Sequence, residues 1–461
     1  MRADLEQRFP DYGRVTNPQP ASVADAQKAL QPTEALLVIY STPDQTYVWA
    51  VPKSGPVSFA VSPLAPKDIG AAVKILRKAL DPDASTAGDI PAFDVATAYK
   101  LYAGLLAPVK PGWQDAKTLL VVANGSLGQL PLGLLTTAKR KAAPDEPGQP
   151  LFSGYRAMPW LIRQVAVTQL PSVTSLTTLR ATPLAKANRK PFIGFGDPYF
   201  SKKEEAQAIA EQGAMMAAQI AGGGLVDMRK APVKLRSAPK TENVNNADLA
   251  LLPRLPDTAE EVKDVALALK ADAGKDVYLG PQANEQIVRT TKLDDRRVIM
   301  FATHGLIPGD LDGLNEPALA LSAPEVAKVQ GDGLLTVSKI LGLRLNADWV
   351  VLSACNTAAG DGAGAEAVSG LGLAFFYAGT RALLVSNWPV ETTSARLLTT
   401  ELFRREATTS GLSRAEALRQ AMLSMLDGPG MIDPRTQKPV YSYAHPIFWA
   451  PFSLFGDGGA S

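Results

Sequence analysis

Short apolar runs that alternate with amphipathic segments are the feature that most constrains how this chain can fold. Toward the C-terminus, the runs "RVIMFA", "DWVVLSA" and "RALLVSN" are almost continuously apolar. Such runs are typical of strands in a parallel sheet that is covered on both faces. Segments with helical periodicity lie between them, for example Leu255–Lys270, in which Val262, Val265 and Leu269 share one face. We therefore predict an α/β fold, a mostly parallel sheet with helices on both faces.

The chain divides into a linker and two α/β lobes. Residues 1–33 are polar and contain proline, which is typical of a linker. Residues 34–185 form the predicted first lobe, which begins with a hairpin in Ala35–Gly55 around a Pro-Asp turn. Residues 186–461 form the second lobe. Within it, Ser201–Ala247 is rich in charge and glycine, and we expect a mobile insertion without regular structure there.

Two helix starts carry the pattern of a capping box, in which a Ser or Thr side chain and a Glu three residues later cap the helix reciprocally. Thr258 with Glu261 fits this pattern, and so does Ser413 with Glu416. We expect a helix to begin at each of these positions.

Charge and residue usage exclude several classes of protein. The 47 basic and 45 acidic residues nearly cancel, so neither nucleic acid nor a membrane is an expected direct partner. One cysteine excludes an intramolecular disulfide framework, and with only two histidines a zinc cluster is not expected either. We predict no metal and no cofactor. The N-terminus lacks a signal sequence and no apolar run reaches about 18 residues, so we expect a soluble, cytoplasmic protein.

One histidine and the only cysteine each follow a predicted strand directly. His304 ends "VIMFATHGL" and Cys355 lies in "VVLSACNTA". Functional groups of parallel sheets gather beyond the carboxyl ends of strands, so the two side chains would meet if their strands are neighbours. Gly305 allows a close backbone approach and offers its N–H to a developing oxyanion. The helix predicted after Cys355 would favour a thiolate.

These residue types suit nucleophilic catalysis. A free thiol is only a few per cent ionised at neutral pH, and a nearby imidazole can take its proton and later protonate a leaving amine. Backbone amides would then stabilise the tetrahedral oxyanion. A dyad can suffice for this chemistry, and no sequence feature nominates a third member.

The chain resembles the CHAT domain, a member of the caspase, separase and gingipain clan of cysteine peptidases. The resemblance lies in "FATHG", "VVLSACNT", "LGLAFFYAGTRALLVSNWPV" and "AHPIFWAPFSLFGD", and upstream in "LLVVANGSLGQLPLGLL", "FGDP" and "LPDTAEEV". These motifs occur in order and cover roughly residues 30–460. After the cysteine the family often has an acidic residue and a glycine beyond Cys-X-Thr, whereas Ala358 follows Thr357 here.

The resemblance implies a fold and a site. The fold would be a caspase-like three-layer α/β/α sandwich with a catalytic lobe and a degenerate N-terminal lobe that lacks the dyad. His304 would be the catalytic histidine, Cys355 the nucleophile, and the amides of Gly305 and Cys355 the oxyanion hole. The enzyme would be a thiol protease that cuts a protein substrate in bacterial-type signalling, defence or cell death. A TPR-containing or other regulatory protein would be its partner.

Several residues near the predicted site have alternative interpretations. Four acidic residues could line a pocket for a basic substrate side chain, or could simply be solvated loop charges; they are Asp310, Asp312, Asp361 and Glu366. Trp388 could form one wall of the cleft or pack in the core. His445 is a rival to His304, although its aromatic surroundings favour a structural role.

Two other functions compete with the peptidase interpretation. The domain could be a catalytically silent CHAT scaffold that only binds other proteins. It could also be a zymogen that is activated by self-cleavage in residues 201–247, where "MRKAPVKLR" is rich in basic residues.

Overall fold

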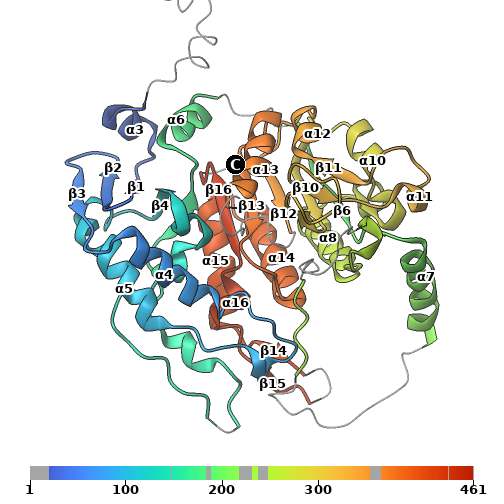
Figure 1. The fold of residues 1–461 in the computed structure, drawn as a ribbon, viewed down its shortest axis with the longest axis horizontal. Coiled ribbons are helices and arrows are strands. Elements are labelled where there is room, and N and C mark those ends of the chain that lie inside the picture. Colours follow the sequence, from blue (N-terminus) through green and yellow to red (C-terminus); the bar gives the residue numbers. More distant parts are fainter. Residues whose placement is uncertain are drawn as a thin grey trace, which may run out of the picture.

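The computed structural model describes residues 20–146, 148–182, 188–217, 231–236, 248–353, 365–433 and 436–459. Within these residues, one mixed sheet of eleven strands crosses the molecule in the order β3-β2-β1-β4-β5-β16-β13-β12-β8-β6-β7 (Figure 1). The first half of the chain supplies β3 (Ser58–Val61), β2 (Thr46–Pro52), β1 (Glu34–Ser41), β4 (Thr118–Ala123) and β5 (Ala166–Gln169). The rest of the chain, from residue 190 on, supplies β16 (Phe452–Gly456), β13 (Ala382–Ser386), β12 (Trp349–Leu352), β8 (Arg296–Ala302), β6 (Lys190–Gly196) and β7 (Val277–Leu279).

Most neighbouring strands of this sheet are parallel. The exceptions are β2 and β3 at one edge and the pair β13–β16. β1 and β2 form the antiparallel hairpin expected in Ala35–Gly55. Two small sheets accompany the large one, the first made of β9 (Gly305–Leu306), β10 (Ala318–Ala320) and β11 (Leu334–Thr336), and the second of β14 (Met431–Ile432) and β15 (Pro439–Tyr441).

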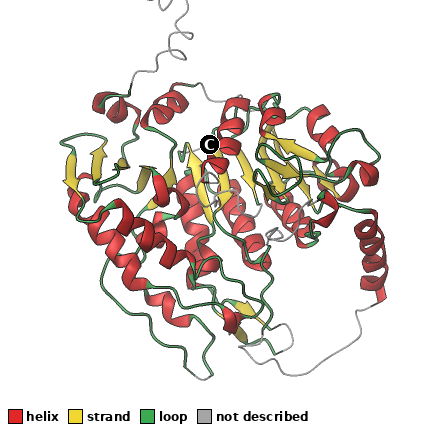
Figure 2. Ribbon diagram, in the orientation of Figure 1, coloured by secondary structure: helices red, strands yellow, loops and turns green. Residues whose placement is uncertain are grey.

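Helices cover both faces of the large sheet, as the red ribbons above and below the yellow strands show (Figure 2). One face is covered by α3 (Val23–Ala29), α6 (Val173–Ala181), α10 (Glu285–Thr290), α12 (Val337–Leu341) and α13 (Ala365–Ala378). The other is covered by α4 (Pro66–Arg77), α5 (Val95–Leu105), α8 (Asp257–Ala268), α14 (Thr392–Thr408), α15 (Arg414–Asp427) and α16 (Pro446–Trp449). Three further helices are α7 (Lys202–Ala217), α9 (Ala273–Asp276) and α11 (Pro324–Ala327). The predicted α/β fold is confirmed.

The central strands β8 and β12 are buried on both faces, which explains why their sequences are continuously apolar. In β12, Val351 packs in the core beneath α8 and α14, whereas Val350 and Leu352 pack in the core beneath α12 and α13. The same alternation places Met300 and Phe301 of β8 in opposite cores. Both strands therefore carry apolar side chains toward both helix layers.

Ser201–Ala247, expected to lack regular structure, is ordered in two places. α7 is a helix, consistent with a composition rich in good helix formers and with Glu204 and Glu205 in its first turn. Residues 231–236 are extended and paired with other parts of the chain. The expectation of no regular structure is wrong at these two places. Helix propensity accounts for α7 and backbone pairing accounts for residues 231–236, and neither requires a periodic pattern of apolar residues. Residues 218–230 and 237–247 lie outside the described part.

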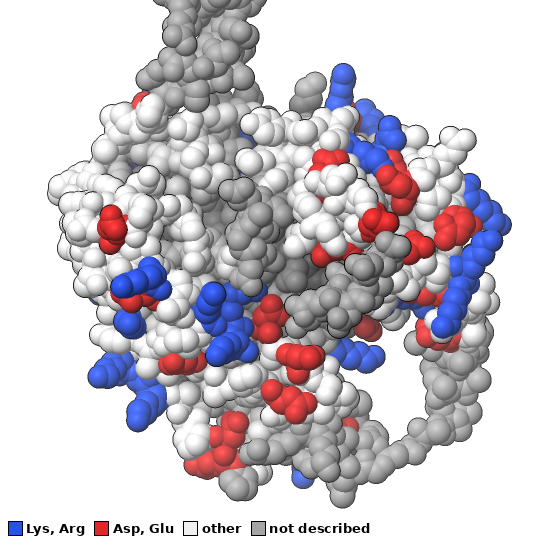
Figure 3. Space-filling view, viewed as in Figure 1, with Lys and Arg blue, Asp and Glu red and all other residues white. Residues whose placement is uncertain are grey.

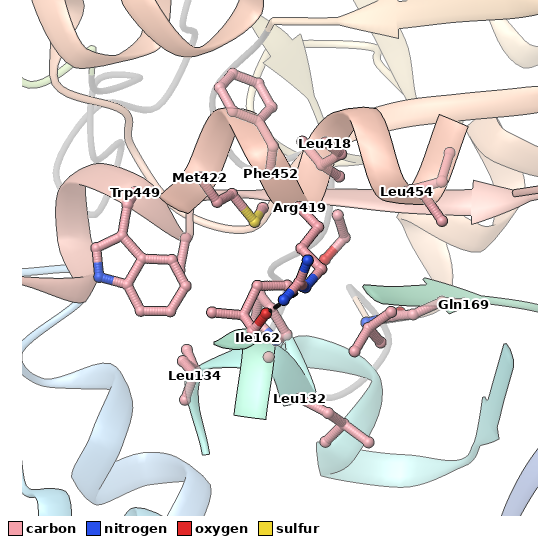
Figure 4. Close-up of a pocket in the computed structure, with 16 residues that line it drawn as sticks. Leu132, Leu134, Ile162, Gln169, Leu418, Arg419, Met422, Trp449, Phe452 and Leu454 are labelled. Carbon is pink, nitrogen blue, oxygen red and sulfur yellow. Dashed lines mark hydrogen bonds between the residues drawn. The ribbon is translucent and has the colours of Figure 1, made fainter. Parts of the chain in front are cut away.

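The two halves of the sheet meet at β5 and β16, and the seam between them is closely packed. A cavity of about 30 Å³ lies there, lined by apolar side chains such as Leu134, Leu418 and Trp449 (Figure 4). The guanidinium of Arg419 closes one side by donating to the carbonyls of Ile162 (2.7 Å) and Arg163 (2.6 Å). A cavity of this size holds about one or two water molecules, so it is not a substrate site.

Acidic and basic side chains are interspersed on the face of the molecule shown in Figure 3. No helix within the described residues is both long enough and apolar enough to cross a membrane.

Candidate active site

The strands that lead to His304 and Cys355 are neighbours. β12 lies parallel to β8, with Leu352 opposite Phe301, and the amide of Ser353 extends the pairing by donating to the carbonyl of Phe301 at 3.0 Å. Both strands thus end at the same edge of the sheet, as the sequence predicted. Cys355 itself lies outside the described residues, and the described chain reaches Ser353, two residues before it.

His304 is fully buried, and only one of its ring nitrogens has a partner among the described residues. Its Nε2 lies 2.7 Å from the carbonyl oxygen of Pro253. A carbonyl can only accept, so Nε2 carries the proton and Nδ1, which is buried without a described partner, carries the lone pair. Burial lowers the pKa of His304; the bond to Pro253 opposes this effect and the cation of Arg236 adds to it. The imidazole is therefore a neutral group whose basic nitrogen has no partner among the described residues.

The acceptor for His304 is held in place by an ion pair. Arg254, the residue after Pro253, makes two hydrogen bonds to the carboxylate of Asp197, at 2.8 and 2.7 Å. Asp197 directly follows β6, and its amide donates to Thr258 Oγ1 at 2.7 Å. Burial raises the pKa of Asp197, although Arg254 works in the opposite direction. The loop that orients the imidazole is thus anchored to the end of a third parallel strand.

The peptide between His304 and Gly305 has a defined direction. The carbonyl of His304 accepts from the amide of Ala320 in β10 at 2.9 Å. The peptide is planar and trans, so the N–H of Gly305 points away from β10. The role of this amide in an oxyanion hole stays a prediction.

A buried ion pair lies beneath the end of β12. The carboxylate of Glu261 accepts from Arg236 Nη1 at 2.6 Å, from Ser353 Oγ at 2.9 Å, and from Thr399 Oγ1 at 3.1 Å. The predicted capping box at the start of α8 is therefore wrong, because the Glu261 side chain reaches across the core, and Thr258 Oγ1 donates to the carbonyl of Leu255 instead. Arg236 is the last residue of "MRKAPVKLR", a stretch whose basic composition suggested self-cleavage and gave no sign of a buried ion pair.

Comparison with known proteins identifies the family. The family profile of the CHAT domain matches residues 95–457. The chain belongs to the CHAT domain family. Among curated protein sequences, none matches this CHAT chain with statistical significance.

Three solved structures are similar to this CHAT protein at low identity. The Saccharomyces cerevisiae separase–securin complex matches with 9% identity and a TM-score of 0.44, over 94% of this chain but only 30% of the separase chain. The Arg-specific cysteine proteinase gingipain R (RgpB) matches with 10% identity and a TM-score of 0.38, over 86% of this chain and 75% of that one. A complex of the Porphyromonas gingivalis RgpB pro- and mature domains matches with 11% identity and a TM-score of 0.34, over 86% and 76%.

The acidic residues predicted for a substrate pocket are only partly described in this CHAT domain. Asp310 accepts from the amide of Ile307 at 2.9 Å in the turn after β9, and burial raises its pKa. Asp312 is exposed, and Glu366 lies in the first turn of α13. Asp361 and the side chain of Glu366 lie outside the described part. The two carboxylates that the structure describes, those of Asp310 and Asp312, do not by themselves define a shared pocket.

Trp388 lies in the core of the CHAT fold. Its indole is fully buried, and Nε1 donates to the carbonyl of Ile447 at 3.2 Å. In this structure the ring presents no surface to a cleft, which agrees with the packing alternative.

His445 is the N-cap of α16 and uses both ring nitrogens. Nδ1 accepts from the amide of Ile447 at 3.2 Å, and Nε2 donates to the carbonyl of Pro91 at 3.1 Å. The rings of Phe152 and Tyr155 lie 5.1 Å from the imidazole, and burial lowers its pKa to about 3. No ring nitrogen is left to act as a base, so this histidine is structural.

The buried imidazole of His445 predicts an acid-sensitive fold. Its pKa in the folded protein lies below the ordinary value of 6.5, so the unfolded chain binds more protons at low pH. The free energy of unfolding should therefore decline as pH falls from about 6.5 toward 3. His445→Asn, which keeps a capping side chain, should flatten this decline in urea unfolding series. An equally steep decline in the variant would contradict the assignment.

Within the described residues, no group of three His, Cys, Asp or Glu side chains is arranged to hold a metal ion.

Proposed function

We propose that this CHAT domain is a cysteine endopeptidase that cleaves a specific protein through an acyl-enzyme on Cys355. The observation that carries the proposal is the neutral imidazole of His304, whose Nδ1 lacks a described partner at the end of β8. The neighbouring strand β12 continues toward the only cysteine of the chain. Cys355 is three residues beyond Leu352, the last residue of β12, and three residues of chain span at most about 11 Å.

The geometry supports a dyad oriented by a backbone carbonyl. Nδ1 of His304 would take the proton of the Cys355 thiol, while Nε2–H stays bonded to Pro253. The thiolate would attack the peptide carbonyl, and the amides of Gly305 and Cys355 would stabilise the oxyanion. The imidazolium would then give its proton to the leaving amine, and water would hydrolyse the thioester. The carbonyl of Pro253 stabilises the imidazolium that forms during the reaction.

The wider role follows from the same proposal. We propose a regulated task in signalling, defence or cell death, in a cytoplasmic setting where the single thiol stays reduced. A TPR-containing or other regulatory protein remains the proposed partner. The proposed substrate pocket still includes Asp310, Asp312, Asp361 and Glu366 and would favour a basic residue before the scissile bond, whereas Trp388 packs in the core and is not part of it.

The single thiol makes the proposal directly testable. A peptide that carries an acyloxymethyl ketone warhead should label Cys355 in the native protein and should fail to label the denatured chain, because attack requires the oriented imidazole. Intact mass spectrometry gives the extent of labelling, with Cys355→Ala as the blank. Labelling that is absent in the native state, or equal in both states, would favour the silent scaffold.

The zymogen alternative has a separate test, the intact mass of the unlabelled protein after long incubation. A loss of mass from the chain that Cys355→Ala abolishes would reveal self-cleavage.

A further inference from the structure

Residues 231–236, here called the docked segment, join the two halves of the molecule through backbone hydrogen bonds. On one side, the carbonyl of Ala231 accepts from Ala87 at 2.9 Å and the amide of Val233 donates to Ser85 at 3.0 Å. On the other side, the amide of Arg236 donates to Val390 at 2.9 Å, just before α14 begins. The segment is a short trace beside α14 in Figure 1. It thus carries Arg236 from outside the sheet into the core.

The side chain of Arg236 completes a buried cluster that draws on three elements. Arg236 is 3% exposed, and its Nη1 donates both to Glu261 of α8 at 2.6 Å and to Ser353 at 3.0 Å. Ser353 Oγ in turn bonds Glu261, and Thr399 of α14 adds a further bond. Glu261 is fully buried, so its carboxylate depends on this cation. Breaking a buried pair by removing one partner is strongly destabilising.

The cluster acts on both arms of the proposed dyad, by hydrogen bonds at the end of β12 and by charge on His304. Ser353 is the last described residue before Cys355, and its amide and hydroxyl are both fixed, the first on Phe301 and the second on Glu261. The same guanidinium adds to the effect of burial in lowering the pKa of His304. One cation therefore restrains the strand end and disfavours a resting imidazolium.

We infer that Arg236 is a positioning residue of this peptidase, which holds Ser353, and through it the strand end that leads to Cys355, in the geometry that the nucleophile needs. The inference rests on the proposed function. It assigns a positioning role to the docked segment, whose backbone pairs with Ser85 and Ala87 on one side and with Val390 on the other.

The test uses the charge-neutral pair R236M/E261Q, which removes both buried charges together and so avoids stranding one of them. The control is R396Q. It breaks the partly exposed ion pair between Arg396 of α14 and Asp264 of α8, the two helices that also carry Thr399 and Glu261 of the buried cluster. The first readout is the rate at which iodoacetamide alkylates Cys355. The second is an NMR titration of the imidazoles, which gives only two signals, since the chain has two histidines.

For R236M/E261Q we expect alkylation to slow by about 10–100-fold, the cost of a displaced reacting group, and the pKa of His304 to rise. The His445 signal and both readouts of R396Q should stay unchanged. Alkylation of R236M/E261Q at the wild-type rate would overturn the inference. If the double variant does not fold, R236K serves as the second variant. It keeps the charge but loses the planar guanidinium, so it should still slow alkylation, and alkylation of R236K at the wild-type rate would equally overturn the inference.

The failure of the proposed function can be told apart from the failure of this inference. If the peptide warhead does not label the wild type, the proposed function fails, whereas the His304 titration still reports whether Arg236 acts on the imidazole.

Discussion

Replacing His304 by alanine is expected to lower kcat/KM for peptide cleavage by about 10²–10⁴-fold, the usual contribution of a general base, and Cys355→Ala is expected to abolish cleavage. The reason is the hydrogen bonding of the imidazole. With Nε2–H bonded to Pro253, Nδ1 is the only ring nitrogen that can accept the thiol proton. Without it, the thiol stays largely protonated at neutral pH. Peptides selected from a library by the wild-type protein would serve as substrates.

His304→Gln separates orientation from proton transfer. Its amide can still donate to the carbonyl of Pro253, but it offers no basic nitrogen, so cleavage should fall as far as in His304→Ala. His304→Gln fills more of the buried space and keeps the bond to Pro253, so it should unfold closer to the wild-type urea concentration than His304→Ala does. Cleavage retained by the glutamine variant would eliminate His304 as the base.

The arrangement of the two strands that lead to His304 and Cys355 was predictable in part, because it depends on local patterns. The runs before His304 and Cys355 are apolar on both faces, which only a sheet covered by two helix layers satisfies. Parallel strands then bring their carboxyl ends to one edge. That β8 and β12 are neighbours was a condition of the prediction, and the structure fulfils it. Asp197 also follows a strand directly, and the same rule could have nominated it.

The groups that support His304 could not be predicted, because they leave no side-chain signature. Its acceptor is a backbone carbonyl, which any residue at position 253 would supply. Arg236 lies in a stretch without apolar periodicity, and main-chain bonds to other parts of the chain place it in the core. Glu261 fits a capping box in sequence, but the buried cation of Arg236 attracts its carboxylate more strongly than the helix start does.

A second network of buried charges holds the two halves of the sheet together at β16. Asp457 directly follows this strand and accepts from Arg180 of α6 at 2.9 Å and from Arg381 at 3.1 Å. Arg180 also pairs with Glu34 of β1, so the network links the first and last strands of the chain. Burial works against the ionised carboxyl, yet Arg180 and Arg414 together hold the pKa of Asp457 below its ordinary value. Its contribution to stability is therefore present above about pH 3.8 and is lost as pH falls through its folded pKa.

Asp457→Ala is expected to lower the free energy of unfolding by about 3–5 kcal/mol, because it leaves buried arginines without their shared carboxylate. The matched control is Asp427→Ala, which breaks the pair with Arg163 across the same two halves. Asp427 is 49% exposed, so this loss should cost at most about 1 kcal/mol. Urea unfolding of both variants at neutral pH and in a series below pH 3.8 measures the difference, which should narrow as pH falls through the folded pKa of Asp457 and the wild-type carboxyl binds a proton. Equal costs for the two substitutions would show that the seam is held by apolar packing around β5 and β16 and not by the buried charges.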